Sequence, residues 1–158
     1  MSYKVLSQRE IVRIINNAPI CEFAIADKCV MPYVVPMYFY YSREERMATF
    51  YLITERNSQI KDILEGNPKA SLLFLTHKTL VAGPGVGNTP NIRYTYCSVI
   101  ADGVCNVITN QSQVDYIYNR ISEKSAQDKA FLRRNIPVAN AAAIKATIGN
   151  MTGRQYIF

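Results

Sequence analysis

The stretch FYLITERNSQIKDILEGNP, residues 50–68, joins an apolar run to a short helix through a polar hinge. The opening letters FYLI have the aromatic and β-branched character of a buried strand. Ser58 is placed to cap the helix, and Gly66 and Pro68 are placed to end it. Lys61 then falls in the first helical turn, where the helix dipole disfavours a cation unless an anion lies nearby.

This lysine can be explained in two ways. If Ser58 caps the helix, the backbone N–H groups of the first turn and the helix dipole favour a bound anion. Thr54 and Arg56 in the hinge add hydrogen-bond donors, so the segment has the pattern of a phosphate cradle. The alternative is an ordinary capped surface helix in which Lys61 pairs with its neighbour Asp62.

Length and composition predict one folded domain spanning residues 1–158, with 49% hydrophobic and 19% charged residues. No apolar run approaches the roughly 18 residues that cross a bilayer. The first seven residues have no hydrophobic signal core. We therefore expect a cytoplasmic protein without a membrane partner.

The apolar runs predict a mainly β protein with peripheral α-helices. Short turns join most of these runs, and regular helical crossovers are lacking, which favours a six-stranded antiparallel barrel over a doubly wound sheet. The six expected strands cover residues 20–27, 31–41, 47–53, 70–76, 93–108 and 141–148.

Three local signals refine this expectation. Ser7 and Glu10 form a capping box that starts the first helix. Pro32 and Pro36 each lack a backbone donor, so their strand should have a free edge or a bulge. Gly103, inside the longest apolar run, also predicts a bulge or bend.

The net charge of +6 comes from scattered Lys and Arg residues, with Arg133 and Arg134 as the only adjacent pair. A positive site for an anionic small molecule accounts for this excess better than nucleic acid does, so we expect no nucleic-acid partner. The four cysteines form no CxxC pair, which argues against a metal site. Each cysteine lies in an apolar run and is expected to be a buried thiol.

The side chains offer little catalytic machinery of their own. The single histidine, His77, is expected at the surface end of a strand, and the catalytic residues are unknown. The glycine-rich segment 79–91 lacks the strand-to-helix context of a nucleotide motif and is expected to be a mobile loop. If the protein is an enzyme, a cofactor should therefore carry the chemistry.

Several segments occur in a recognisable order. They are a capped first helix, CEFAIAD with PYVVPMYFYY, FYLIT with SQIKDILEGNPKASLLF, RYTYCSVIADGVCNVI and IGNMTGRQ. This set resembles the FMN-binding split-barrel proteins, the superfamily of the pyridoxamine-phosphate oxidases, and within it most closely the 5-nitroimidazole-resistance group. The resemblance implies a homodimer with flavin bound between the subunits.

The resemblance also implies which residues contact the flavin. The first three below would meet the isoalloxazine ring, the next three would line the same groove, and the hinge residues with the lysine would hold the phosphate. The last two would reach the groove from the same or the other subunit. The implied set is Pro36, Met37, Tyr38, Tyr51, Ile53, Thr54, Ser58, Lys61, Arg93 and Tyr96.

The implied function is a flavin-dependent oxidoreductase that reduces a small acceptor such as a nitroaromatic 5-nitroimidazole, which would confer antibiotic resistance. The alternative is a flavin-binding module without efficient turnover, acting in sensing, storage or sequestration. Ile53 stands where the resistance group commonly has a histidine, and the hinge is one residue longer than its usual pattern.

FMN is favoured as the cofactor because one short cradle matches one phosphate, whereas FAD could extend along residues 83–88. The aromatic run 38–41 is expected to bury one face in the partner subunit.

Overall fold

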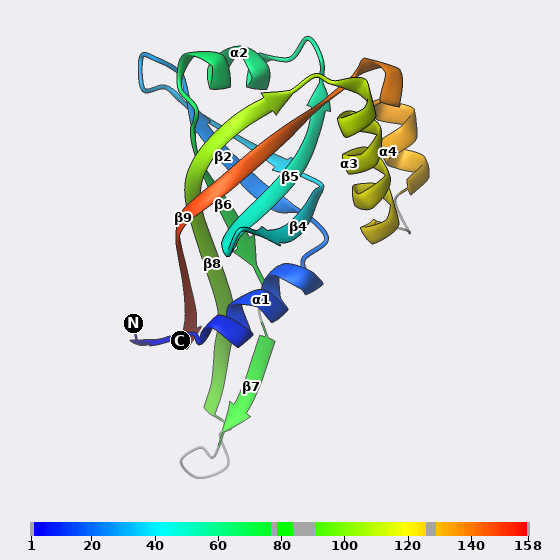
Figure 1. The fold of residues 1–158 in the computed structure, drawn as a ribbon. Coiled ribbons are helices and arrows are strands. Elements are labelled where there is room, and N and C mark those ends of the chain that lie inside the picture. Colours follow the sequence, from blue (N-terminus) through cyan, green and yellow to red (C-terminus); the bar gives the residue numbers. More distant parts are fainter. Residues whose placement is uncertain (1, 77–78, 84–90, 126–128, 158) are drawn as a thin grey trace.

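The computed structural model describes residues 2–76, 79–83, 91–125 and 129–157, which form one antiparallel sheet with associated helices (Figure 1). In chain order the elements are β1 (Ser2–Val5), α1 (Gln8–Asn17), β2 (Cys21–Ala26), β3 (Pro32–Met37), β4 (Phe39–Glu44), β5 (Met47–Glu55), α2 (Gln59–Gly66), β6 (Lys69–Leu75), β7 (Thr79–Gly83), β8 (Asn91–Ile108), α3 (Gln111–Lys124), α4 (Lys129–Asn135), the 3-10 turn η1 (Val138–Asn140) and β9 (Ala141–Ile157).

The prediction of a mainly β, antiparallel fold with helices is confirmed. The main path through the sheet is β3-β2-β6-β8-β9-β5-β4, with β1 added to β9 and β7 added to β8. The described strands number nine and not six. The predicted strands did not include β1 or β7, and β3 and β4 were predicted as one strand. The last strand was predicted to end at residue 148, although β9 continues to Ile157.

The prediction of one strand over residues 31–41 is wrong. The chain leaves β3 after Met37 and enters β4 at Phe39, and these two strands lie at opposite ends of the sheet path. No ladder joins β3 to β4 among the described residues, so the curled sheet is open between them. Of the described strands, only β2 pairs with β3, which confirms the free edge predicted from Pro32 and Pro36.

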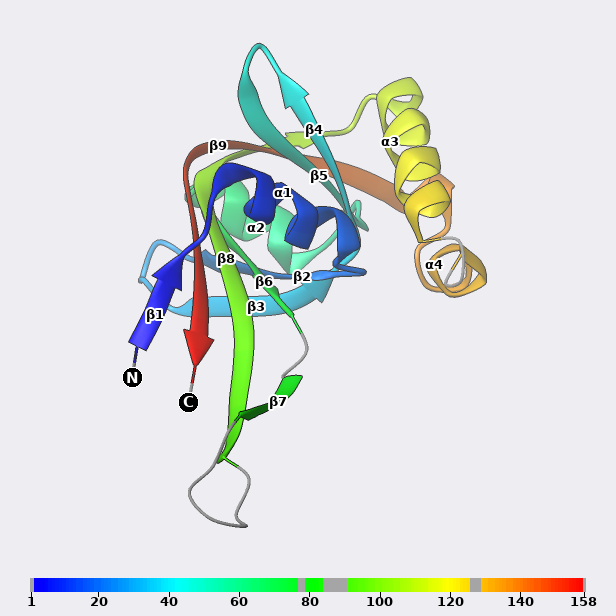
Figure 2. The ribbon, with the colours of Figure 1, turned by 90° about the horizontal axis from the view of Figure 1, so that it is seen from below.

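The core lies inside the curl of the sheet. Phe23, Phe39, Phe50 and Phe74 are fully buried there, and the rings of Phe39 and Phe74 meet edge to face at 5.0 Å. Helices α1 and α2 pack their apolar faces into this core from its two ends (Figures 1 and 2). Side chains therefore fill the inside of the curled sheet, and helices α1 and α2 cover its two ends.

A second apolar cluster lies outside the curl, where α3 and α4 pack against β5 and β9 (Figure 1). It contains Ile53, Ile117, Ile121, Leu132 and Ala143, all less than 5% exposed. This cluster fixes the two helices beside the end of β5, and that position matters for the site described below.

The aromatic run 38–41 makes contacts within one subunit on both of its faces. Phe39 and Tyr41 point into the core, whereas Tyr38 and Tyr40 pack against the cluster under α3. Residues alternate in direction along an extended chain, so both faces of this run are used within one subunit. The three tyrosines are only partly buried, and their burial against a partner subunit stays a prediction.

The local signals hold. Both halves of the capping box form, because the Glu10 carboxylate accepts from Ser7 N–H at 2.8 Å and the Ser7 hydroxyl oxygen accepts from Glu10 N–H. Ser58 caps α2 as predicted. The β8–β9 register shifts between Asp102 and Gly103, which confirms the bulge.

The predictions for the cysteines and for the loop 79–91 are only partly confirmed. Cys21 and Cys105 are buried as predicted, but Cys29 is exposed in the β2–β3 turn and Cys97 is only half-buried. The predicted loop 79–91 is partly wrong, since Thr79–Gly83 forms β7. Residues 84–90 and His77 lie outside the described residues. Within the described parts of the chain, none of the helices is long and apolar enough to cross a membrane.

Candidate functional site

A cleft of about 310 Å³ lies at the meeting point of four parts of the chain. These are the link between β3 and β4, the end of β5, the start of α2 and helix α4. We call this cleft the hinge cleft. The described residues that line it are Val35, Pro36, Met37, Tyr38, Ile53, Thr54, Glu55, Ser58, Ile60, Leu132, Asn135 and Ile136.

One end of the hinge cleft is polar. The Thr54 hydroxyl donates to Ser58 Oγ at 3.0 Å, and Ser58 Oγ also accepts from Lys61 N–H at 3.3 Å. The first N–H groups of a helix have no acceptor within the helix, and Ser58 satisfies one of them. No hydrogen bond from the N–H groups of Gln59 and Ile60 is found among the described residues, so both can meet an outside acceptor. This end therefore suits an anion such as a phosphate.

The other end of the hinge cleft is apolar. Ile53 and Leu132 are 4% and 3% exposed, and Met37 and Ile136 complete the walls. A flat ring system could bury its faces between such walls. Glu55 is the one charged residue among the described lining residues, and it is acidic. A positive side chain that pairs with a bound anion must therefore come from a residue outside this lining.

Six of the ten predicted site residues gather in the hinge cleft: Pro36, Met37, Tyr38, Ile53, Thr54 and Ser58. The other four lie elsewhere. Tyr51 is two residues before Ile53 on β5, but its ring stacks on Tyr40 and its hydroxyl is bonded to Glu44.

The Tyr51 hydroxyl is part of a small polar network. Lys145 Nζ donates to the second oxygen of the Glu44 carboxylate at 2.7 Å. That bond chiefly lowers the pKa of Glu44, and burial chiefly raises the pKa of Tyr51. Tyr51 therefore keeps its proton at neutral pH and donates a hydrogen bond to Glu44, which does not line the hinge cleft.

Lys61 also stands apart from the lining. Its Nζ lies 3.5 Å from Glu65 one turn along α2, so its partner is Glu65 and not the expected Asp62. An i,i+4 ion pair on a helix surface contributes only about 0.3–0.5 kcal/mol. The lysine could exchange this partner at little cost.

Arg93 and Tyr96 lie in β8 at its junctions with β7 and the end of β9, opposite α2 in Figure 1. The Tyr96 ring stacks on Tyr156 with a centroid distance of 4.9 Å. The side chain of Arg93 is outside the described part of the structure. Tyr96 is not among the described residues that line the hinge cleft of its own chain.

The α4 wall could not be predicted from the sequence. Leu132, Asn135 and Ile136 reach the hinge cleft only because α3 and α4 fold back onto β5. They lie far along the chain from the hinge, and no motif connects the two segments. The hinge pattern predicts Arg56 as a donor, but its hydrogen bond to Gln111 on α3 could not be predicted, for the same reason.

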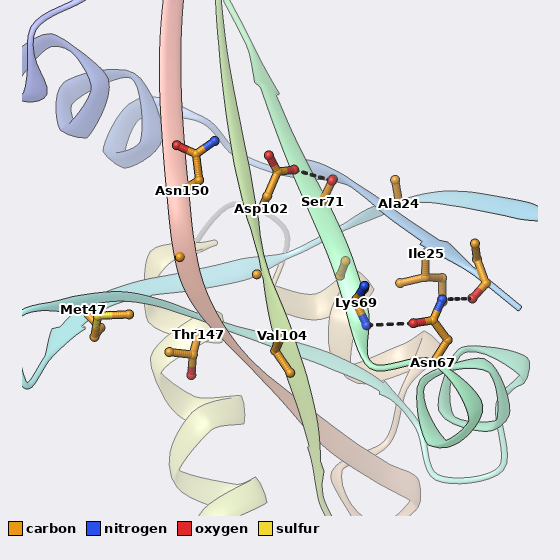
Figure 3. A pocket seen from close by; sticks show the side chains of 14 residues that line it. Ala24, Ile25, Met47, Asn67, Lys69, Ser71, Asp102, Val104, Thr147 and Asn150 are labelled. Atoms are coloured by element: carbon orange, nitrogen blue, oxygen red, sulfur yellow. Dashed lines mark hydrogen bonds between the residues drawn. The ribbon is translucent and has the colours of Figure 1, made fainter. Parts of the chain in front are cut away.

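A larger groove of about 850 Å³ lies on the outer face of the sheet (Figure 3). The Ser71 hydroxyl on β6 donates to Asp102 on β8 across this groove. Lys69 lies on the same strand as Ser71, and Asn150 lies on β9, on the other side of β8. Paired positions form a row, Val34–Ala24–Ser71–Asp102–Asn150, with a parallel row Pro36–Glu22–Leu73–Ile100–Thr152. Because α1 and α2 pack inside the curl, Val34, Ile100 and Val104 remain 59%, 43% and 48% exposed.

The outer groove lacks the features of a chemical site. No capped helix start faces it, and within the described residues no cluster of His, Cys, Asp and Glu could hold a metal ion. It is a broad, mainly apolar face of a kind that marks protein contacts. The hinge cleft, although smaller, is the better candidate for chemistry.

Solved structures similar to this chain share its fold. A candidate 5-nitroimidazole antibiotic resistance protein from Bacteroides thetaiotaomicron has a TM-score of 0.78 at 21% identity, covering 99% of this chain and 89% of that one. An FAD-binding protein from Mesorhizobium loti has a TM-score of 0.72 at 19% identity, covering 99% of both chains. An FAD and haem binding protein from Mycobacterium smegmatis has a TM-score of 0.64 at 16% identity, covering 97% of this chain and 72% of that one.

No curated protein was found to match the chain. A family model described as pyridoxamine 5'-phosphate oxidase matches residues 7–150. This match confirms the superfamily that the sequence resembles, and the chain belongs to the pyridoxamine 5'-phosphate oxidase family.

Proposed function

We propose that this protein binds a flavin in the hinge cleft and acts as a flavin-dependent oxidoreductase on a small acceptor. The observation that carries the proposal is the cleft itself, which joins a capped helix start to a narrow apolar slot. A bound flavin would supply the electron transfer, which the side chains here cannot perform. The family match and the two FAD-binding neighbours support the same cofactor class.

The chain's own residues would bind and orient the flavin. Thr54, Ser58 and the first N–H groups of α2 would hold a phosphate, and Lys61 would join them by leaving Glu65. Pro36, Met37 and Tyr38 would lie along the ring and exclude water. FMN is our preferred cofactor because its single phosphate matches the single polar end.

A second copy of the chain would complete the site. Pro36 belongs both to the hinge cleft and to a row of the outer face, so the two surfaces are continuous. A symmetric dimer through the outer face would cover Val34 and Ile100. It would also bring a second β8, carrying Arg93 and Tyr96, toward the hinge cleft.

Position 53 favours a second candidate function. Ile53 is 4% exposed within the apolar cluster under α3, so it offers no proton where the resistance group commonly has a histidine. A flavin held there could be bound without efficient turnover, as in sensing, storage or sequestration. A neutral, flat acceptor such as a 5-nitroimidazole remains our first choice, because the slot is apolar and the Bacteroides neighbour is a candidate resistance protein.

The test has two stages. The purified protein is titrated with FMN and FAD and followed by visible absorbance. We expect uptake of one flavin per chain, and no uptake of either would overturn both functions. The bound flavin is then reduced anaerobically and mixed with a 5-nitroimidazole or a quinone. Reoxidation faster than that of free flavin supports the oxidoreductase, whereas an equal or slower rate supports the binding module.

A further inference from the structure

The polar end and the α4 wall of the hinge cleft come from distant parts of the chain, and one residue joins them. We propose that Arg56 is a positioning residue that braces the hinge against α3 and η1 and so sets the shape of the phosphate cradle. This inference rests on the proposed flavin site. Arg56 does not line the hinge cleft, so it would act through the residues that do.

Two short bonds attach Arg56 to the rest of the chain. Its backbone N–H donates to the Asn140 carbonyl oxygen at 2.7 Å, which fixes the hinge to η1. Its guanidinium donates through Nη2 to Gln111 Oε1, also at 2.7 Å, which fixes the hinge to the first residue of α3. Both bonds start between Thr54 and Ser58, the two residues that form the polar end of the hinge cleft.

Gln111 is itself held in place. Its amide nitrogen donates to Asp115 Oδ1 at 2.8 Å and to the Val138 carbonyl oxygen at 3.4 Å. These bonds turn Gln111 Oε1 toward the arginine. Farther along α3, the Tyr118 hydroxyl donates to the carbonyl oxygen of Ile136, a residue of the wall, at 2.9 Å. A continuous chain of contacts therefore connects the cradle to the wall through α3.

Besides these two bonds, the hinge is held by the β5–β9 ladder, which continues through Glu55, and by the Thr54–Ser58 contact. Glu55 and Asn57 are exposed, and the hinge adds none of its own apolar side chains to the core. The Arg56 Nε is buried and has no partner among the described residues, which is a cost to folding. A preorganised cradle gains affinity because less order is lost on binding.

Four variants separate positioning from charge. Arg56→Gln removes the charge and shortens the donor, and Arg56→Lys keeps the charge but loses the planar fork. Gln111→Ala removes the acceptor and leaves Arg56 intact. Arg9→Gln, an exposed residue of α1 at the far end of the molecule, is the control for net charge. FMN affinity, the FMN dissociation rate and the visible circular dichroism of the bound flavin are measured with the thermal midpoint.

We expect Arg56→Gln and Gln111→Ala each to weaken FMN binding roughly tenfold, mainly through faster dissociation, and to reduce the visible dichroism. The double variant should be no weaker than the worse single variant, because both break one contact. Arg56→Lys should recover part of the affinity, and Arg9→Gln should match the wild type.

Two results would overturn the brace. One is a lower thermal midpoint with wild-type FMN affinity and dichroism, which would make the contact merely structural. The other is weak binding by Arg56→Gln with normal binding by Gln111→Ala and Arg56→Lys, which would mean that charge alone matters. If the wild type takes up no flavin, the proposed function fails as well, and the wild-type titration identifies that case.

Discussion

Lys61 lies in the first turn of α2, where the helix dipole disfavours a cation unless an anion lies nearby. Its place in the first turn of α2 suggests a phosphate ligand, yet its Nζ pairs with Glu65. Side chains on a helix lean toward its N-terminus, so the lysine can swing to the polar end of the hinge cleft. The surface pair it would give up is worth little.

This exchange predicts opposite effects for the two partners. Lys61→Gln should weaken FMN binding about fivefold, because it removes a charge-assisted contact to the phosphate. The free energy of unfolding should change by less than about 0.5 kcal/mol. Glu65→Gln frees the lysine and should leave FMN binding equal or tighter. Wild-type affinity in Lys61→Gln, measured by fluorescence quenching, would assign this lysine to the helix surface only.

At the scale of elements, local chemistry was predictable and long-range pairing was not. The Ser7 capping box, the Ser58 cap and the Gly103 bulge depend on neighbouring residues, and all three are confirmed. The interruption at Tyr38 between β3 and β4 is not marked by a turn residue in the sequence. It exists because the two halves of the run 31–41 pair with different strands at opposite sheet ends.

The bulge gives a direct test of packing. A Cβ at residue 103 would lie 2.2 Å from the Thr147 carbonyl oxygen, whereas a Cβ at Gly149 would meet nothing within 4 Å. Gly103→Ala should therefore lower the free energy of unfolding by about 3 kcal/mol, because backbone must move. Gly149→Ala is the matched control and should be close to neutral. Urea unfolding that gives the two variants equal stability would contradict this account of the bulge.

Helix α3 is attached to the core through a half-buried lysine. Lys124 Nζ lies 3.1 Å from the centroid of the Phe39 ring and donates to the Ala18 carbonyl oxygen at 2.9 Å. Burial lowers the pKa of Lys124 from 10.5 to about 8. The folded chain therefore releases this proton at a lower pH than the unfolded chain does.

The sign of the resulting pH dependence follows from this difference. Between about pH 8 and 10.5 the unfolded state binds more protons at Lys124, so this residue makes stability rise with pH. Burial raises the pKa of Cys21 and of Cys105 to about 12, and these thiols act in the opposite direction above pH 9. The stability difference between wild type and Lys124→Met isolates the lysine. This difference in unfolding free energy should shift in favour of the wild type from pH 7.5 to 9.5. A constant difference would contradict the lowered pKa of Lys124.

At the scale of the whole molecule, six predicted site residues share one cleft, and four do not. The six lie on the adjacent segments 36–38 and 53–58, which the resemblance could place by motif. The α4 wall and the outer face could not be predicted, because both depend on how distant strands and helices come together. The outer face is made from rows of single residues on five strands, and no contiguous stretch of sequence reveals it.

The outer face predicts a monomerising substitution. Ile100 is 43% exposed at its centre, and a charge there would be buried without a partner in the dimer. Ile100→Glu should therefore yield monomers at micromolar concentration and weaken FMN binding, because in the proposed dimer the second copy would complete the site. Tyr116→Glu, on the exposed side of α3, is the control. Light scattering that shows the same dimer for both variants would place the interface elsewhere.

We have proposed that a flavin is bound in a cleft completed by a second copy of the chain. Sedimentation velocity of the FMN-saturated protein, recorded at 280 nm for protein and at about 450 nm for flavin, tests both parts together. We expect a single boundary at both wavelengths with the mass of a dimer and one flavin per chain. Flavin absorbance that stays behind with the free cofactor, or that travels with a monomer, would contradict it.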